Sequence, residues 1–215
     1  MNVLNLNNNN IKSIESAAFS NLRTIQLFLS GNRISSVGDW FNDTIINVLD
    51  LSSNSIIFLE SNAFQNVENL TTVHLNKNRI TFIEAAVFRK QTRIDLSSNY
   101  LDNINFLGET KLEYLDISFN QISSLQLSEE TYIEEIIIYP NPWNCQCLRK
   151  FWRLAWKRGT RYGYPSLPVL NSSVPVCIDR DVCDEQYIDA QLREQYYRHE
   201  IVKDVYTVKI KLVRW

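Results

Sequence analysis

The chain has 215 residues, with 22 Lys and Arg against 24 Asp and Glu and a formal net charge of −2. This balance, without a long run of one sign, gives no indication of binding to nucleic acid or to an anionic membrane surface. No apolar stretch approaches the roughly 18 residues that a membrane-spanning helix needs. The first residues also lack the basic segment and apolar core of a signal peptide.

Asparagine recurs along the first two thirds of the chain at intervals of 21 to 24 residues. Each asparagine follows an apolar residue by three positions and precedes another by two, as in the segment LDLSSNSI. A period of about 20 to 29 residues with this pattern is typical of leucine-rich repeats. The pattern predicts an array of about seven units over residues 1–141, built around Asn9, Asn32, Asn54, Asn78, Asn99, Asn120 and Asn141.

Each unit is expected to contribute one short strand to a curved parallel sheet. Alternating residues such as Leu49 and Leu51 would point into the core, and the residues between them would lie on the concave face. The asparagine then turns the chain, and its side chain can satisfy backbone groups that no strand partner reaches. We therefore interpret the asparagines as structural and not as a row of ligand-binding groups.

The second half of several units carries an Ala-Phe or Ala-x-Phe element, which is expected to fill the irregular or 3-10 convex side. It occurs at Phe19, Phe64 and Phe88, and the shorter units that follow lack it. Burial of each ring should contribute about 1.5–3 kcal/mol. In the second unit, Leu22 and Ile25 fit one spacing of apolar residues, whereas Leu27 and Leu29 fit another. A local bulge is therefore expected near Thr24 to Gln26.

Residues 142–183 are expected to close the array. Leu148, Phe151, Trp152, Ala155 and Trp156 recur at helical spacing, which predicts one apolar helix face lying across the last unit. Basic residues and Gly159 then end the helix. The predicted fold is thus an α/β solenoid with a helical C-terminal cap.

All four cysteines lie in this region, which favours a local disulfide framework and an oxidising compartment. Four cysteines allow three pairings, and the two members of a C-x-C segment pair poorly. Sequons at Asn42, Asn69 and Asn171 agree with extracellular glycosylation. With no N-terminal cap before the first unit, we expect a piece of a longer secreted protein; a cytosolic protein is the alternative.

The segment NPWNCQC at residues 141–147, followed by an aromatic amphipathic helix, resembles the cysteine-rich C-terminal cap of extracellular leucine-rich-repeat proteins. That class includes Toll-like receptors, neuronal adhesion proteins and insect immune factors. The resemblance implies that Cys145 pairs with Cys177 and that Cys147 pairs with Cys183. The layout is also similar to mosquito leucine-rich-repeat immune molecules, in which a coiled coil follows the cap. Residues 184–215 are accordingly interpreted as the possible start of a coiled coil, or as an extra strand.

Signs of catalysis or of a cofactor are absent from the sequence. There are two histidines and five glycines, and no metalloprotease, nucleophile-elbow or phosphate-loop spacing occurs. Asp50, Asp95 and Asp116 occupy the same strand position, which could indicate a metal or paired-carboxylate site. We favour a structural role, since these aspartates can accept hydrogen bonds from nearby serines and backbone N–H groups.

Aromatic residues gather at the C-terminal end of the predicted concave face, where exposed aromatics would favour a protein interface. The predicted partner-binding site is centred on Tyr114, Asp116, Ile137 and Tyr139, with Arg93 and His74 at its edge. Alternatively, the segment from Tyr162 to Val174 covers these residues. The predicted function is non-catalytic recognition of a protein ligand or co-receptor, with a possible oligomer partner at the tail. An adhesion or matrix scaffold and a receptor ectodomain are the alternatives.

Overall fold

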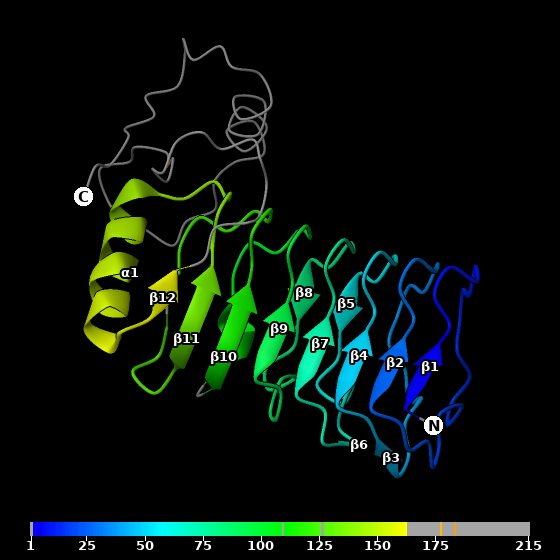
Figure 1. Cartoon of the computed structure of the whole chain (residues 1–215). Helices are drawn as coiled ribbons and strands as arrows, with labels where there is room; N and C mark the ends of the chain where they lie inside the picture. Colours follow the sequence, from blue (N-terminus) through cyan, green and yellow to red (C-terminus); the bar gives the residue numbers. More distant parts are fainter. Residues whose placement is uncertain (1, 109, 126, 163–176, 178–182, 184–215) are drawn as a thin grey trace.

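The computed structural model describes residues 2–108, 110–125, 127–162, 177 and 183. Its main feature is a parallel sheet of eight strands in the order β1-β2-β4-β7-β9-β10-β11-β12 (Figure 1). Each strand follows its neighbour after one turn of the chain, so the predicted solenoid is confirmed. The strands are β1 (Val3–Asn5), β2 (Gln26–Phe28), β4 (Val48–Asp50), β7 (Thr72–His74), β9 (Arg93–Asp95), β10 (Lys111–Asp116), β11 (Tyr132–Ile137) and β12 (Arg161–Tyr162).

The other elements lie between these strands or after them. Two pairs of two-residue strands join adjacent units away from the main sheet, and one 3-10 helix and one α-helix complete the described part of the chain. They are β3 (Thr44–Ile45) with β6 (Val67–Glu68), β5 (Phe58–Leu59) with β8 (Phe82–Ile83), η1 (Asn105–Leu107) and α1 (Cys145–Arg158).

The core is a set of parallel columns of apolar side chains, because every strand pairs in register with the next. The central strand position is fully buried from β2 to β11. Its residues are Leu27, Leu49, Val73, Ile94, Leu115 and Ile136. The residues immediately before and after each of these buried positions lie on the opposite face, which we call the outer sheet face.

The asparagines act as predicted. The amide nitrogen of Asn54 donates to the carbonyls of Leu29 and Leu51, at 3.0 and 3.1 Å, and its side-chain oxygen accepts the N–H of Ile34 at 3.0 Å. Each asparagine side chain thus bonds to its own unit and to the preceding one. The same arrangement recurs at Asn78, Asn99, Asn120 and Asn141, whereas Asn9 in the first unit is exposed.

The irregularity expected near Thr24 occurs in the second to sixth units and not in the second alone. The N–H groups of Ile25 and Gln26 both donate to the carbonyl of Asn2, and equivalent pairs occur at 47–48, 71–72, 92–93 and 113–114. Two outward residues therefore separate consecutive core positions. Thr24 fills the first core position and is buried, while Ile25 is half exposed, which resolves the two competing registers.

The predicted phenylalanines pack along the side of the solenoid opposite the sheet. Phe64 and Phe88 stack with ring centroids 6.0 Å apart, and Phe88 meets Phe106 edge-on at 5.8 Å. Phe106, in η1, takes the position that the sequence pattern left empty in the next unit. Phe41 stacks on Phe19 in the same way, with ring centroids 5.9 Å apart.

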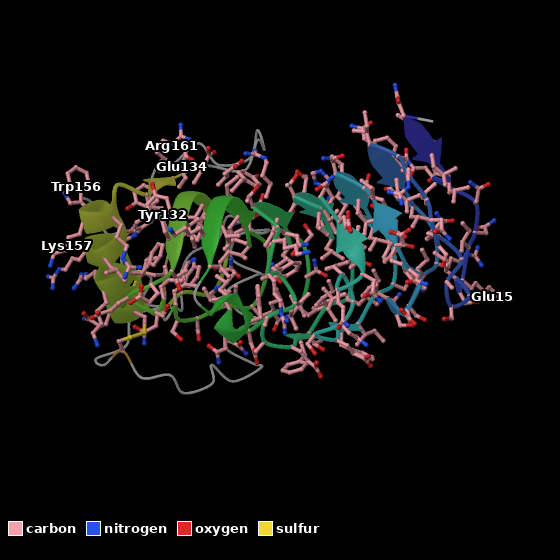
Figure 2. All side chains as sticks on the ribbon, turned by 90° about the horizontal axis from the view of Figure 1, so that it is seen from below. Glu15, Tyr132, Glu134, Trp156, Lys157 and Arg161 are labelled. Atoms are coloured by element: carbon pink, nitrogen blue, oxygen red, sulfur yellow. A yellow bond between two sulfur atoms is a disulfide. The ribbon has the colours of Figure 1, made fainter. Side chains whose placement is uncertain are left out.

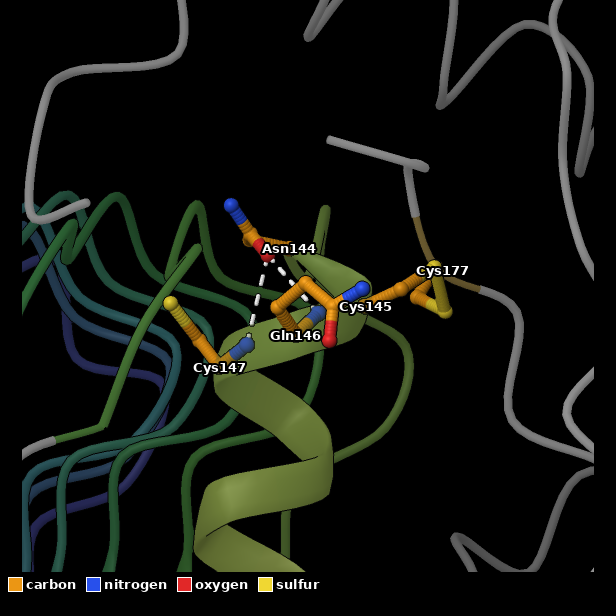
Figure 3. Close-up of a disulfide and its surroundings, with 5 residues drawn as sticks. All are labelled: Asn144, Cys145, Gln146, Cys147 and Cys177. Carbon is orange, nitrogen blue, oxygen red and sulfur yellow. Dashed lines mark hydrogen bonds between the residues drawn. A yellow bond between two sulfur atoms is a disulfide. The ribbon is translucent and has the colours of Figure 1, made fainter. Parts of the chain in front are cut away.

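The cap helix α1 stands at the end of the sheet beside β12, far from the N-terminus (Figure 1). The side chain of Asn144 accepts the N–H groups of Gln146 and Cys147 at its start, and Gly159 ends it at φ 70° (Figure 3). Leu148, Phe151 and Ala155 are buried. The predicted apolar face was wrong in one residue, because Trp156 is 82% exposed.

Both disulfides implied by the family resemblance are confirmed. Cys145 is bonded to Cys177 and Cys147 to Cys183, with S–S distances of 2.06 and 2.08 Å. They tie the first turn of α1 to residues 32 and 36 positions further along the chain. The tail predicted over residues 184–215 lies outside the described residues, and the division into array, cap and tail stays a prediction.

The end of α1 is held by one side chain. The Arg158 guanidinium donates to the carbonyls of Ser128, Glu129 and Thr131, at 2.7 to 3.2 Å. This turn immediately precedes β11. Arg158 therefore links the cap to the last predicted repeat, and β12 then adds a strand that the sequence pattern did not predict.

Replacing Asn120 with alanine is expected to lower the free energy of unfolding by about 3 kcal/mol, because buried carbonyls and an N–H group lose their partner. Urea denaturation measures this change. Asn62→Ala is the control, since the side chain of this exposed asparagine forms no hydrogen bond with the described residues. Equal stability of the two variants would contradict the structural role of the repeated asparagines.

Replacing Arg158 with alanine is expected to cost about 1–2 kcal/mol, since three carbonyls lose a charged donor that is partly exposed to water. Lys157→Ala removes a cation from the same helical turn but no bond to another element, and should leave stability unchanged. Thermal denaturation followed by circular dichroism distinguishes the two. The same loss in both variants would mean that Arg158 acts through helix charge alone.

Candidate partner-binding surface

The outer sheet face presents columns of side chains fixed by the strand register. The column at the C-terminal ends of the strands contains Asn5, Phe28, Asp50, His74, Asp95, Asp116 and Ile137. Beside it runs a second column, which contains Val3, Gln26, Val48, Thr72, Arg93, Tyr114, Glu135 and Arg161. As far as Ile137 and Glu135, these columns are the ones that the asparagine spacing predicts; Arg161 is added by β12.

The six residues of the predicted site divide into two groups. Arg93 is exposed, and Tyr114 and His74 are partly exposed. Asp116, Ile137 and Tyr139 are buried, with 8%, 7% and 6% of their surface exposed. The expectation that these three residues are exposed is thus corrected, although Asp116 and Ile137 lie on the outer sheet face by register. All but the first residue of the segment named as the alternative cover lies outside the described residues.

Four residues on β9 and β10 form a connected group that we call the Tyr114 cluster: Arg93, Glu113, Tyr114 and Asp116. The Arg93 guanidinium lies 5.1 Å from the centre of the Tyr114 ring, within the range of a cation–π interaction. The Tyr114 hydroxyl donates to Asp116 at 3.4 Å, and Arg93 and Glu113 form an exposed ion pair at 3.7 Å. Arg93 therefore contacts the face of the Tyr114 ring, while Asp116 bonds to its hydroxyl group.

Burial dominates the protonation of this cluster. It raises the pKa of the Asp116 carboxyl to about 6, although hydrogen bonds from Ser118 favour the ionised form. Burial and then the charges of Asp116 and Asp95 raise the pKa of Tyr114 as well. The Tyr114 phenol therefore remains a protonated donor, and Asp116 changes charge close to neutral pH.

The aspartate row has the structural role that the sequence analysis favoured. Asp50 accepts the N–H of Ser52 at 2.9 Å, and Asp95 accepts both the N–H and the hydroxyl of Ser97 at 3.0 and 2.7 Å. Within the described ranges, no group of three or more His, Cys, Asp or Glu side chains is placed to hold a metal ion.

Sequence reasoning missed an ion-pair group at the C-terminal edge of the sheet. Arg161 on β12 lies 2.7 Å from Glu134 and 3.7 Å from Glu135 on β11 (Figure 2). Glu134 and Glu135 are the two outward residues between the buried core residues Ile133 and Ile136. Their partner could not be found without knowing that β12 returns beside β11.

Two of the three predicted glycosylation sites can be placed. Asn42 and Asn69 are exposed, and they flank the paired strands β3 and β6 on the side away from the main sheet. Asn171 lies outside the described residues. No helix in the described part of the chain is long and apolar enough to cross a membrane.

Comparison with known proteins agrees with this architecture. Family models described as leucine-rich repeats match residues 1–22, and again 26–80, 44–94 and 68–122, which together exceed half of the chain. No curated protein matches the sequence.

Two mosquito structures are similar in fold. One is the LRIM1/APL1C complex, with a TM-score of 0.56, 18% identity, and 74% of this chain and 35% of that chain covered. The other is the APL1 leucine-rich repeat domain, with a TM-score of 0.57, 18% identity, and 83% and 53% covered. The match spans about a third and about half of the length of these solved chains.

Asp116 should make stability depend on pH. Its pKa is about 6 when folded and about 3.9 when unfolded, so the folded state holds the proton more tightly. Unfolding free energy should therefore rise by on the order of 2 kcal/mol as pH falls from about 7 to about 4. Asp116→Asn should lack this contribution.

The measurement compares urea denaturation of both proteins across that pH range. Other carboxyl groups titrate in both proteins, so the difference in their unfolding free energies isolates Asp116. A difference that stays constant with pH would show that folding does not shift the pKa of this carboxyl.

Proposed function

Since this chain belongs to the leucine-rich-repeat family, we propose that it is a non-catalytic protein-recognition module that binds its partner on the outer sheet face around the Tyr114 cluster. Leucine-rich-repeat domains present extended surfaces of this kind. The observation that carries the proposal is the accessible pair of Arg93 and Tyr114, held in a defined geometry by their neighbours.

The chemistry of the cluster suits a protein interface. Tyr and Arg are enriched among the residues that dominate binding energy, because each combines a large contact area with a polar group. Tyr114 is already fixed by Asp116 and Arg93, so little conformational freedom is left to lose on binding. His74, two strands away on the same face, is an accessible edge residue that the partner would contact. Asp116 and Ile137 lie in the neighbouring column of the same face, and Tyr139 follows two residues later; all three are buried, so they would support the contact and not form it.

The proposed setting is extracellular, with a part in innate immunity. The two disulfides support an oxidising compartment. The fold similarity to LRIM1 and APL1C, which occur together in one complex, supports the immune setting. In this setting Asn42, Asn69 and Asn171 would carry glycans, and residues 184–215 would mediate oligomerisation. An adhesion or matrix scaffold or a receptor ectodomain is the second candidate.

The double substitution Arg93→Ala with Tyr114→Ala tests the site. Wild-type and variant chains are used as bait in a cross-linking pull-down from body fluid, and captured proteins are quantified by mass spectrometry. The variant is expected to lose at least about tenfold of the specific capture, because interface aromatics and arginines each contribute on the order of 2 kcal/mol.

The matched control is Arg79→Ala with Phe82→Ala, which removes an exposed arginine and an exposed aromatic ring from another part of the solenoid. Both variants should keep the wild-type melting temperature. Capture that is unchanged by the Tyr114 variant, or lost only in the control, would place the partner elsewhere.

A further inference from the structure

The solvent-facing side of the cap helix α1 is strongly basic. The helix carries five of the 22 Lys and Arg residues and none of the 24 Asp and Glu residues, although the chain as a whole has a net charge of −2. Arg158 is used in the contact with residues 128–131. The other four cations are Arg149, Lys150, Arg153 and Lys157.

Within the described part of the chain, these four side chains have no counter-ion. Lys150, Arg153 and Lys157 are exposed, Arg149 is partly exposed, and none of the four forms an ion pair or a side-chain hydrogen bond with the described residues. Arg149 and Arg153, and again Arg153 and Lys157, are spaced by four positions, where like charges oppose helix formation. The fold thus holds repelling charges together on one face.

Trp156 lies on the same face. Figure 2 shows Trp156 and Lys157 on the side of α1 that points away from the sheet, and 82% of the Trp156 surface is exposed. At about 100° per residue, the four cations and this indole fall within an arc of about 120°. That arc lies opposite the buried residues Leu148, Phe151 and Ala155.

The helix is fixed in place while it presents this face. The two disulfides, the Asn144 cap at its start and the Arg158 contact at its end all anchor it to the solenoid. The exposed indole and the cations therefore do not need to order themselves on binding. We call Arg149, Lys150, Arg153, Trp156 and Lys157 together the basic cap face.

We propose that the basic cap face docks the chain on an anionic phospholipid surface. Charge complementarity requires an anionic partner, and the outward position of the face at the end of the solenoid leaves it open to a broad surface. An indole partitions into the interface of a bilayer without a preformed pocket, and each nearby Lys or Arg adds attraction to anionic headgroups. A sulfated polysaccharide would engage the cations without using Trp156, and an acidic protein would need a pocket for it.

The test is co-sedimentation of the full chain with vesicles of phosphatidylcholine alone or of equal parts phosphatidylcholine and phosphatidylglycerol. We expect binding to the anionic vesicles alone, lost at high salt. Arg153→Gln with Lys157→Gln should weaken the partition coefficient by about 25-fold, at about fivefold per cation. Trp156→Ala should weaken it by about tenfold.

Lys77→Gln with Lys90→Gln is the matched control, because it removes two exposed cations from the repeats and should leave binding unchanged. All variants should keep the wild-type melting temperature. The bilayer contact is read independently from quenching by brominated lipid, which Trp156→Phe should abolish. Equal binding to neutral vesicles, no vesicle binding, or retention only on heparin or an acidic peptide would overturn the proposal.

Discussion

The constraint on which the structure depends is the hydrogen bonding of backbone groups at the turn after each strand. Strand partners satisfy the backbone within the sheet, but the turn lies in the interior where water cannot reach it. The asparagine side chain supplies two donors and an acceptor there, and it bonds to the unit before its own as well. Because a buried polar group without a partner is costly, this requirement fixes the register of successive units, while the length between asparagines varies from 21 to 24 residues.

The register in turn decides what each side chain can do. A column that is buried in one unit is buried in the next, so the outward residues also align across the sheet. Arg93 and Tyr114 meet because they occupy equivalent positions on adjacent strands. The two proposed surfaces have different chemistry for the same reason: the outer sheet face combines aromatic and acidic side chains, whereas the outward side of α1 contains only cations, glutamine and an indole.

Much of this could be predicted from the sequence. The asparagines, the core columns and the order of the strands follow from local patterns that repeat, and the cysteine pairs follow from the family resemblance. The errors concentrate at the C-terminal end. Ile137 and Tyr139 continue the outward columns in sequence but are buried, and Trp156 continues the apolar helical spacing but is exposed. Thr24, a polar residue, occupies a core position in the second unit.

The sequence by itself determined the solenoid, its period and the face on which each repeat residue lies, because every unit meets the same local requirements. Only the tertiary structure decided which residues near the cap remain accessible. There the repeat ends, and burial depends on how α1 and β12 pack against the last units. No periodic pattern contains that contact, so the Arg161 ion pairs and the exposure of Trp156 on the basic cap face became visible only in three dimensions.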